Sequence, residues 1–241
     1  MAEGKENKIH SEDSVRNWFD RWYAEKKWNS MRNFKAYPVY LDYLNVKPGT
    51  FLLDIGCGPG WLLQTASRRG LKSCGVDLSR EAVRLARITS PESLITVGSV
   101  TGIPFAAHSF HYITCIGVLE HFLNMESSIA EMKRVAKSDS VYCIMVPNSK
   151  TFYWKLAEKF SRNHRESNEN ARALEEWKKF FTTNGFRIYD IRRDEWIIRK
   201  TLSVVGLGSF SGLIRKVQQV IWSFVPLKYS RQFVFILEIE Y

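Results

Sequence analysis

The chain has 241 residues, 45% of them hydrophobic and 25% charged, a composition typical of a globular protein with room for one full core. Its net charge of +10 favours anionic partners, whereas a polar start and the lack of an apolar run of about 18 residues argue against a secretory leader and a membrane span. Four scattered cysteines without a CxxC or Cys/His cluster argue against disulfides and zinc. We therefore expect a reduced, cytoplasmic setting and no metal site.

Hydrophobic periodicity predicts helices and strands that alternate along most of the chain. An amphipathic helix is expected at 14–23, and a second helical stretch at 37–44 leads to a Lys-Pro-Gly turn. Ser79 is the expected N-cap of a later helix, and Gly185 the expected stop of another. The elements that follow are strand 51–55, helix 61–69, strand 72–77, helix 80–87, strands 94–99 and 111–117, helix 126–136, strand 140–146, helix 171–184, and strands 187–193 and 231–241.

This alternation predicts an α/β fold, a Rossmann-like seven-stranded, mostly parallel sheet with helices on both faces. Two consecutive strands at the end of the chain predict an antiparallel last strand. Three segments, 1–45, 148–170 and 196–230, do not fit the alternation. We expect an N-terminal helical lid at 1–45 and one domain at 46–241 with two lid insertions, gathered at the carboxyl ends of the strands, where open α/β sheets bind ligands.

A glycine-rich turn follows the strand at 51–55, in the sequence LLDIGCGPGW. Its spacing is Asp54-x-Gly56-x-Gly58-x-Gly60, and a second acid, Asp77, ends the next strand. Bare backbone N–H groups in such a turn can approach a ligand closely, and a carboxylate at the second strand suits a ribose. A nicotinamide site would have GxGxxG, and a P-loop would continue with GK[ST]. Asp54, two residues before the first glycine, suits a ligand with a cationic group.

These residues resemble the class I S-adenosylmethionine-dependent methyltransferases, in the small-molecule branch that includes quinone and polysaccharide methylators. The resemblance runs through LLDIGCGPG, GVDLS, IPFAAHSFHYITCIGVLEHF and VPNS, and it covers about residues 40–147. It implies the sheet order 3-2-1-4-5-7-6 with strand seven antiparallel, and S-adenosylmethionine as the cofactor. Transfer to a small-molecule or lipid-linked acceptor, by in-line displacement, is the activity that it implies.

The resemblance also implies a set of cofactor-binding residues. Gly56, Gly58 and Gly60 would face the methionyl part of the cofactor, and Asp54 would orient its amino group. Asp77 would hold the ribose. The family places an aspartate after strand three against the adenine amino group, where this chain has Ser99. The remaining implied contacts are Leu78 against the adenine, Val100 beside Ser99, and Gly117 and Val118 at the methionyl end.

Methyl transfer from a sulfonium depends mainly on alignment of the acceptor and on exclusion of water. A hydroxyl acceptor also needs a base, and His121, just after strand four, is the first candidate. The alternative is that His121 only fixes its loop by hydrogen bonding. His164 with Glu166 is a second candidate pair. Two aromatic residues of the N-terminal segment, Tyr23 and Trp28, line the acceptor pocket or belong to the core.

The residues from Trp196 to Leu237 include six bases and no acid, which indicates either a solvated basic face or a surface for an anionic partner. Within this segment, 211–225 is amphipathic and suits a core helix, a lid or a membrane-surface helix. The basic charge also leaves a nucleic-acid methyltransferase as an alternative, although strand four ends in GVLEHF and no RNA-binding module is visible. A non-catalytic Rossmann-like binding module is the third interpretation.

Overall fold

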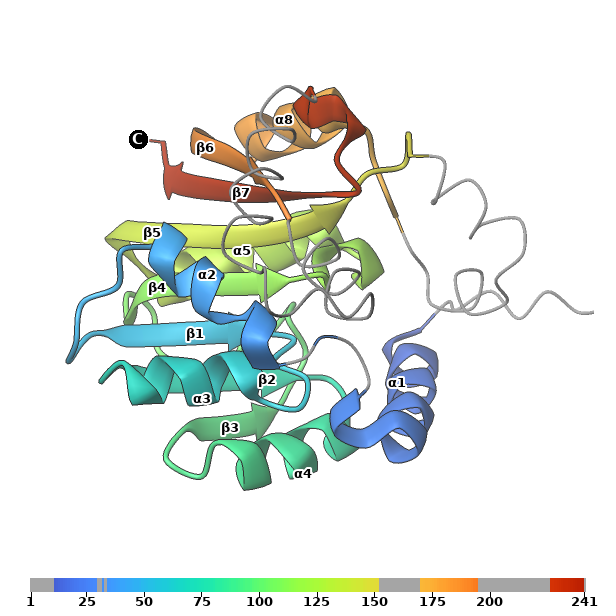
Figure 1. Ribbon diagram of the computed structural model, residues 1–241, viewed down its shortest axis with the longest axis vertical. Helices are drawn as coiled ribbons and strands as arrows, with labels where there is room; N and C mark the ends of the chain where they lie inside the picture. The colour runs from blue at the N-terminus through green and yellow to red at the C-terminus, as the bar shows by residue number, and fades with distance from the viewer. Residues whose placement is uncertain (1–10, 30–31, 33, 152–169, 195–225, 241) are drawn as a thin grey trace, which may run out of the picture.

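The computed structural model describes residues 11–29, 32, 34–151, 170–194 and 226–240. Within these residues the strands form one seven-stranded sheet in the order β3-β2-β1-β4-β5-β7-β6 (Figure 1). Strand β7 runs antiparallel to both of its neighbours, and the other pairs are parallel. The predicted fold and strand order are therefore confirmed. The strands are β1 (Phe51–Ile55), β2 (Lys72–Asp77), β3 (Leu94–Val97), β4 (Phe110–Ile116), β5 (Ala136–Pro147), β6 (Phe186–Arg193) and β7 (Gln232–Ile239).

Helices cover both faces of this sheet, and a separate hydrophobic cluster lies under each layer. On one face, α2 (Pro38–Tyr43), α3 (Trp61–Arg68) and α4 (Arg80–Thr89) pack on β1 and its neighbours. On the other face, α5 (Met125–Val135) and α8 (Leu174–Thr183) cover β4, β5 and β7, with Trp177 fully buried. Apolar residues on both faces explain why the central strands read as continuous hydrophobic runs.

Helix α1 (Glu12–Lys26) lies beyond the carboxyl ends of the strands rather than on either face of the sheet (Figure 1). Its carboxyl-terminal neighbour, Trp28, packs with α4 and donates from Nε1 to Thr89 Oγ1 (2.9 Å). The later part of the N-terminal segment differs, because Tyr40 and Leu41 of α2 are fully buried in the core. Of the described residues in 11–45, α2 thus packs in the core, and α1 lies apart from both faces of the sheet. The N-terminal helical lid at 1–45 stays a prediction.

The start of β5 differs from the sequence prediction. A helix at 126–136 and a strand from 140 were expected, whereas β5 follows α5 directly and begins at Ala136. The extra residues are accommodated by a register shift, since Phe110 pairs with Ala136 and Tyr112 pairs with Val141. Such an irregularity leaves no periodic hydrophobic pattern by which the sequence could reveal it.

Candidate active site

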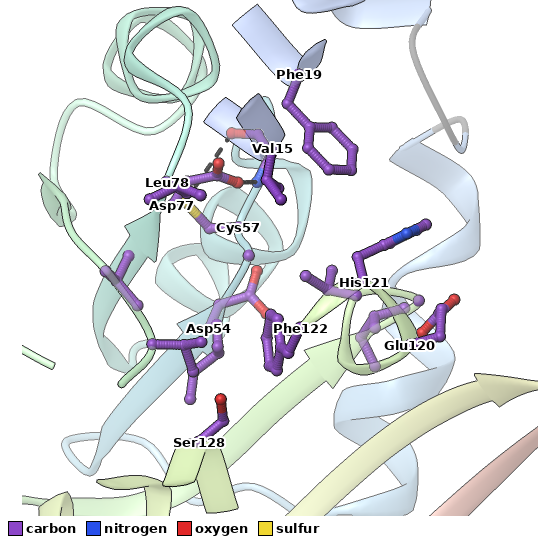
Figure 2. Close-up of a pocket in the computed structure, with 18 of the residues that line it drawn as sticks. Val15, Phe19, Asp54, Cys57, Asp77, Leu78, Glu120, His121, Phe122 and Ser128 are labelled. Atoms are coloured by element: carbon purple, nitrogen blue, oxygen red, sulfur yellow. Dashed lines mark hydrogen bonds between the residues drawn. The ribbon is translucent and has the colours of Figure 1, made fainter. Parts of the chain in front are cut away.

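A cavity of about 560 Å³ lies at the carboxyl ends of β1, β2 and β4, beneath α1 (Figure 2). This volume is within the roughly 300–1,000 Å³ of small-molecule sites. Residues from the glycine turn, from the ends of β2 and β4 and from α1 line it together. Among the residues proposed from the sequence, those on its wall are Asp54, Gly56, Gly58, Asp77, Leu78, Ser99, Val100, Gly117, Val118, His121 and Tyr23.

The glycine turn runs from β1 to α3 with three glycines in left-handed conformation. Gly56 has a φ of +66°, and a Cβ there would lie 2.5 Å from Val118 Cγ1. Gly58 has a φ of +50°, and its Cβ would lie 2.9 Å from the Tyr23 hydroxyl. Gly60 has another role, because it is the N-cap of α3, and a Cβ there would lie 3.0 Å from Ala86 of α4. Two of the glycines therefore shape the cavity wall, and the third permits two helices to approach.

The carboxylate of Asp77 fixes the turn from the end of β2. Its Oδ2 accepts a hydrogen bond from the Gly58 N–H (2.8 Å), and its Oδ1 accepts one from the Ser79 N–H (2.9 Å). Burial raises the pKa of Asp77 to about 6, although these two hydrogen bonds act in the opposite direction. A buried acceptor held rigidly on the cavity wall is a suitable partner for ribose hydroxyls.

Asp54, at the end of β1, is the second buried carboxylate, 4% exposed. Its Oδ1 accepts a hydrogen bond from Thr114 Oγ1 of β4 (2.7 Å). Burial raises the pKa of Asp54 to about 7, opposed by the Thr114 hydrogen bond and assisted by the negative charge of Asp77. Two desolvated acids that open into one cavity form a site that favours a cationic ligand.

Helix α1 covers these carboxylates with mostly apolar side chains. Val15 and Phe19 point from α1 toward the cavity in Figure 2, and Tyr23 is buried against the glycine turn. Asp20 anchors the helix, because its Oδ1 accepts hydrogen bonds from Ser79 Oγ (2.6 Å) and from the Glu81 N–H (3.1 Å) at the start of α4. The expected cap is confirmed as well, since Ser79 Oγ accepts from the Ala82 N–H (3.0 Å).

Burial, followed by the charge of Asp77, raises the pKa of Tyr23 well above that of an ordinary tyrosine. Tyr23 therefore remains a neutral phenol, and it lines the cavity beside Gly58. Trp28 agrees with the second alternative, a packed position, because it lies against the small hydrophobic cluster of α1 and α4 and donates to Thr89. Of these two aromatic residues, Tyr23 is the one on the cavity wall.

The end of β4 supplies Gly117, Val118 and the short 3₁₀ helix η3 (Leu119–His121). Glu120 and His121 are both buried and line the cavity. The His121 ring lies edge-on to Phe19 with their centroids 5.4 Å apart. His111, at the opposite end of β4, accepts from the Phe51 N–H through Nδ1 (3.1 Å), so the two histidines have unrelated surroundings.

The cavity is also lined by two members of a polar cluster that the sequence did not indicate. Arg32 donates to Asp194 Oδ2 (2.7 Å) and to the Tyr40 hydroxyl (3.0 Å), and Gln232 Oε1 accepts from the same guanidinium. The Tyr40 hydroxyl donates in turn to Asp194 Oδ1 (3.1 Å). Arg32 and Gln232 line the cavity, so this cluster forms a polar wall distant in sequence from the glycine turn.

Several sequence candidates lie outside the described residues, namely His164, Glu166 and the amphipathic segment 211–225. Most of 148–170 and 196–230 lies outside them as well, so those two expected lid insertions stay predictions. In the described part of the chain, no group of three or more His, Cys, Asp or Glu residues could hold a metal ion. The four cysteines, all described, are buried free thiols. No described helix is long and apolar enough to cross a membrane.

Comparison with known proteins identifies the family. Residues 53–144 match the domain described as "Methyltransferase domain". A ubiquinone biosynthesis O-methyltransferase of Hahella chejuensis is 31% identical over 181 residues, which cover 70% of this chain and 71% of that protein. A second protein of that name, from an Azoarcus species, is 32% identical over 126 residues, covering 47% of this chain and 54% of its own length.

Solved structures of methyltransferases share the fold at low sequence identity. A putative methyltransferase of Haloferax volcanii, in complex with the Trm112 methyltransferase activator, has a TM-score of 0.71 at 15% identity, covering 94% of this chain and 98% of that one. Phosphoethanolamine N-methyltransferase 2 of Haemonchus contortus, in complex with S-adenosyl-L-methionine, has a TM-score of 0.63 at 17% identity, covering 96% and 60%.

The sheet order, the glycine turn and the acids that end β1 and β2 define a Rossmann-like methyltransferase domain. The chain belongs to the class I S-adenosylmethionine-dependent methyltransferases, and its cofactor is S-adenosyl-L-methionine. The site fits this group, because left-handed glycines leave room at the turn and two buried carboxylates suit its cationic and ribose parts. Family membership also favours an enzyme over a non-catalytic binding module.

Proposed function

We propose that the chain transfers a methyl group from S-adenosylmethionine to a hydroxyl group of a small-molecule or lipid-linked acceptor. The observation that carries this proposal is a single cavity that is lined by the buried acids Asp54 and Asp77 and by His121. The name O-methyltransferase of the Hahella chejuensis relative supports oxygen as the accepting atom. A cytoplasmic location belongs to the same proposal and is supported by the free thiols. Peripheral contact of 196–230 with anionic lipid belongs to it as well, and is supported by the five bases of this segment.

When bound, the cofactor supplies an electrophilic methyl group on a sulfonium. In the proposed arrangement, Asp54 holds its amino group, Asp77 holds its ribose, and Gly56 and Gly58 leave room for its methionyl part. Helix α1 excludes water by covering these groups with Val15 and Phe19. The acceptor would lie in the same cavity, between His121 and the polar cluster that contains Arg32, and would contact the apolar side chains that line the cavity.

The test of this function is transfer of labelled methyl groups from S-adenosylmethionine to a cell extract that is then separated into lipid, small-molecule and nucleic-acid fractions. Label in the first two fractions supports the proposal, and label confined to nucleic acid supports the alternative. Calorimetry tests the cofactor assignment, because S-adenosylhomocysteine should bind to the protein and NADH should not. Binding of NADH with no response to S-adenosylhomocysteine would contradict the cofactor assignment.

His121 is proposed as the general base for the acceptor hydroxyl, so His121→Ala should lower kcat by about 100-fold or more, in the range of general-base catalysis. Because the imidazole acts on the acceptor, the affinity for S-adenosylhomocysteine should change little. The matched control is His111→Ala, a histidine in the first half of β4, at the end of the strand away from η3 and His121. Equal kcat values for His121→Ala and the wild type, in folded protein, would leave His121 a structural role.

Asp77→Ala should weaken cofactor binding by about 1–3 kcal/mol, the cost of hydrogen bonds lost from a charged acceptor. The free energy of unfolding should fall as well, because the buried N–H groups of Gly58 and Ser79 lose their acceptor. Calorimetric titration with S-adenosylhomocysteine and urea unfolding measure the two effects. Asp77→Asn, which retains one acceptor oxygen, is the control for turn geometry, and unchanged affinity in both variants would remove Asp77 from the site.

A further inference from the structure

The loop after β3 lacks the acid that the resemblance leads one to expect, and α1 brings one to the same place. Ser99 stands at the position of the family's aspartate. Its hydroxyl donates a hydrogen bond to Glu12 Oε1, and the Thr101 hydroxyl donates to the same oxygen at 3.4 Å. Glu12 and Ser99 are separated by 87 residues, so only the fold places them together.

Glu12 lies on the wall of the cavity that also contains Asp77 and Leu78. Val100 and Leu78, partly buried on the same wall, are the apolar side chains that would lie against a flat base. Both hydroxyl contacts go to one oxygen of the Glu12 carboxylate, and its second oxygen can accept another proton donor. Glu12 is therefore a hydrogen-bond acceptor in the part of the cavity where the adenine would lie.

The residues around Glu12 stabilise a carboxylate, because they donate hydrogen bonds to it. A serine at position 99 can donate to Glu12, whereas two carboxylates so close together would repel each other. The Asp20 contacts with Ser79 and Glu81 fix α1 on α4, so that its first turn stays over the β3 loop. Glu12 is thus held by its own helix and by the loop that it faces.

We propose that Glu12, in the first turn of α1, accepts a hydrogen bond from the exocyclic amino group of the cofactor's adenine. Glu12 would then replace the acid that is absent at position 99. The inference rests on the proposed cofactor site and makes α1 a specificity-determining part of it. A carboxylate can only accept hydrogen bonds, so it discriminates an adenine amino group, a donor, from the 6-oxo group of hypoxanthine, an acceptor.

The test compares two ligands, S-adenosylhomocysteine and S-inosylhomocysteine, by calorimetry. The wild type should bind the adenine ligand at least about 10-fold more tightly, as expected for a hydrogen bond to a charged acceptor. Glu12→Gln should reduce this preference to less than about 3-fold, because an amide can turn its NH₂ group toward the 6-oxo oxygen. Retention of the full preference by Glu12→Gln would overturn the inference.

Two further variants exclude indirect effects. Asp13→Asn removes the same charge from the same turn of α1, but Asp13 is exposed and pairs with Arg16, so the preference should stay unchanged. The double variant Glu12→Gln with Ser99→Asp returns an acid to the β3 loop, to which the glutamine amide can donate, and the preference should return. Failure of the wild type to bind S-adenosylhomocysteine at all would instead contradict the proposed function, which keeps the two outcomes distinct.

Discussion

Asp54→Asn is expected to weaken cofactor binding by about 10- to 100-fold and to make the ligand-free protein more stable. The loss follows from removal of the charge that would pair with the cofactor's amino group, a contribution of about 1.5–3 kcal/mol. The gain in stability is expected because burial disfavours the charged carboxylate, which raises the pKa of Asp54 to about 7, and asparagine carries no charge. Asparagine keeps an acceptor for the Thr114 hydroxyl, so the local geometry is preserved.

The two effects of Asp54→Asn depend on pH with a definite sign. The folded protein holds the Asp54 proton more tightly than the unfolded chain, in which the pKa of aspartate is about 3.9. The free energy of unfolding of the ligand-free wild type therefore falls as the pH rises from about 4 to about 7. The free energy of unfolding of Asp54→Asn should not fall over this pH range. The variant should therefore be about as stable as the wild type near pH 4, and more stable by roughly 2–4 kcal/mol above pH 7.

Urea unfolding at pH 4.5 and pH 8, with and without S-adenosylhomocysteine, measures these differences. In the wild type the affinity for this ligand should decrease below about pH 7, because the carboxylate must lose its proton to pair with a cation. Asp139→Asn, at an exposed position near the start of β5, is the control and should follow the wild type. A variant as stable as the wild type at both pH values would show that burial of Asp54 carries no energetic cost.

The sequence predicts the sheet and one side of the cavity because both depend on local patterns. Parallel strands place their carboxyl ends at one edge, so residues that follow separate strands, such as Asp54, Asp77 and Gly117, come together once the strand order is known. The order itself came from the resemblance, and the antiparallel β7 from two consecutive strands. Periodicity, glycine spacing and strand ends, together with the order that the resemblance implied, were sufficient for this part.

The other side of the cavity depends on contacts that no local pattern reveals. The amphipathic pattern of α1 indicates that one helix face is buried, but not that Glu12 meets Ser99 or that Phe19 meets His121. Arg32 and Asp194 are 162 residues apart and form a buried ion pair. Since such pairs arise from the tertiary fold, a single sequence provides no signal for them apart from their residue types.

Gly56→Ala is expected to destabilise the protein and to disable the cofactor site together. A left-handed φ of +66° costs a residue with a Cβ about 1–2 kcal/mol. In addition, that Cβ would lie 2.5, 2.7 and 2.9 Å from three carbon atoms of Val118, a β-branched side chain with little rotamer freedom. Either the turn or Val118 must move, and both line the cavity, so the affinity for S-adenosylhomocysteine should fall by more than about 10-fold, the equivalent of about 1.4 kcal/mol.

Other glycines of the chain separate the cost of the left-handed φ from the cost of the close contact with Val118. Gly49→Ala has a similar φ of +80° but open space around its Cβ, so it should show the backbone cost alone and bind the ligand normally. Gly102→Ala, with open space and no left-handed φ, should be close to neutral. In the double variant Gly56→Ala with Val118→Ala, the two closest contacts, with Cγ1 and Cγ2, are removed, so part of the affinity should return. If Gly56→Ala instead matched Gly49→Ala in both unfolding free energy and affinity, the close approach of Val118 to the turn would have no role in the site.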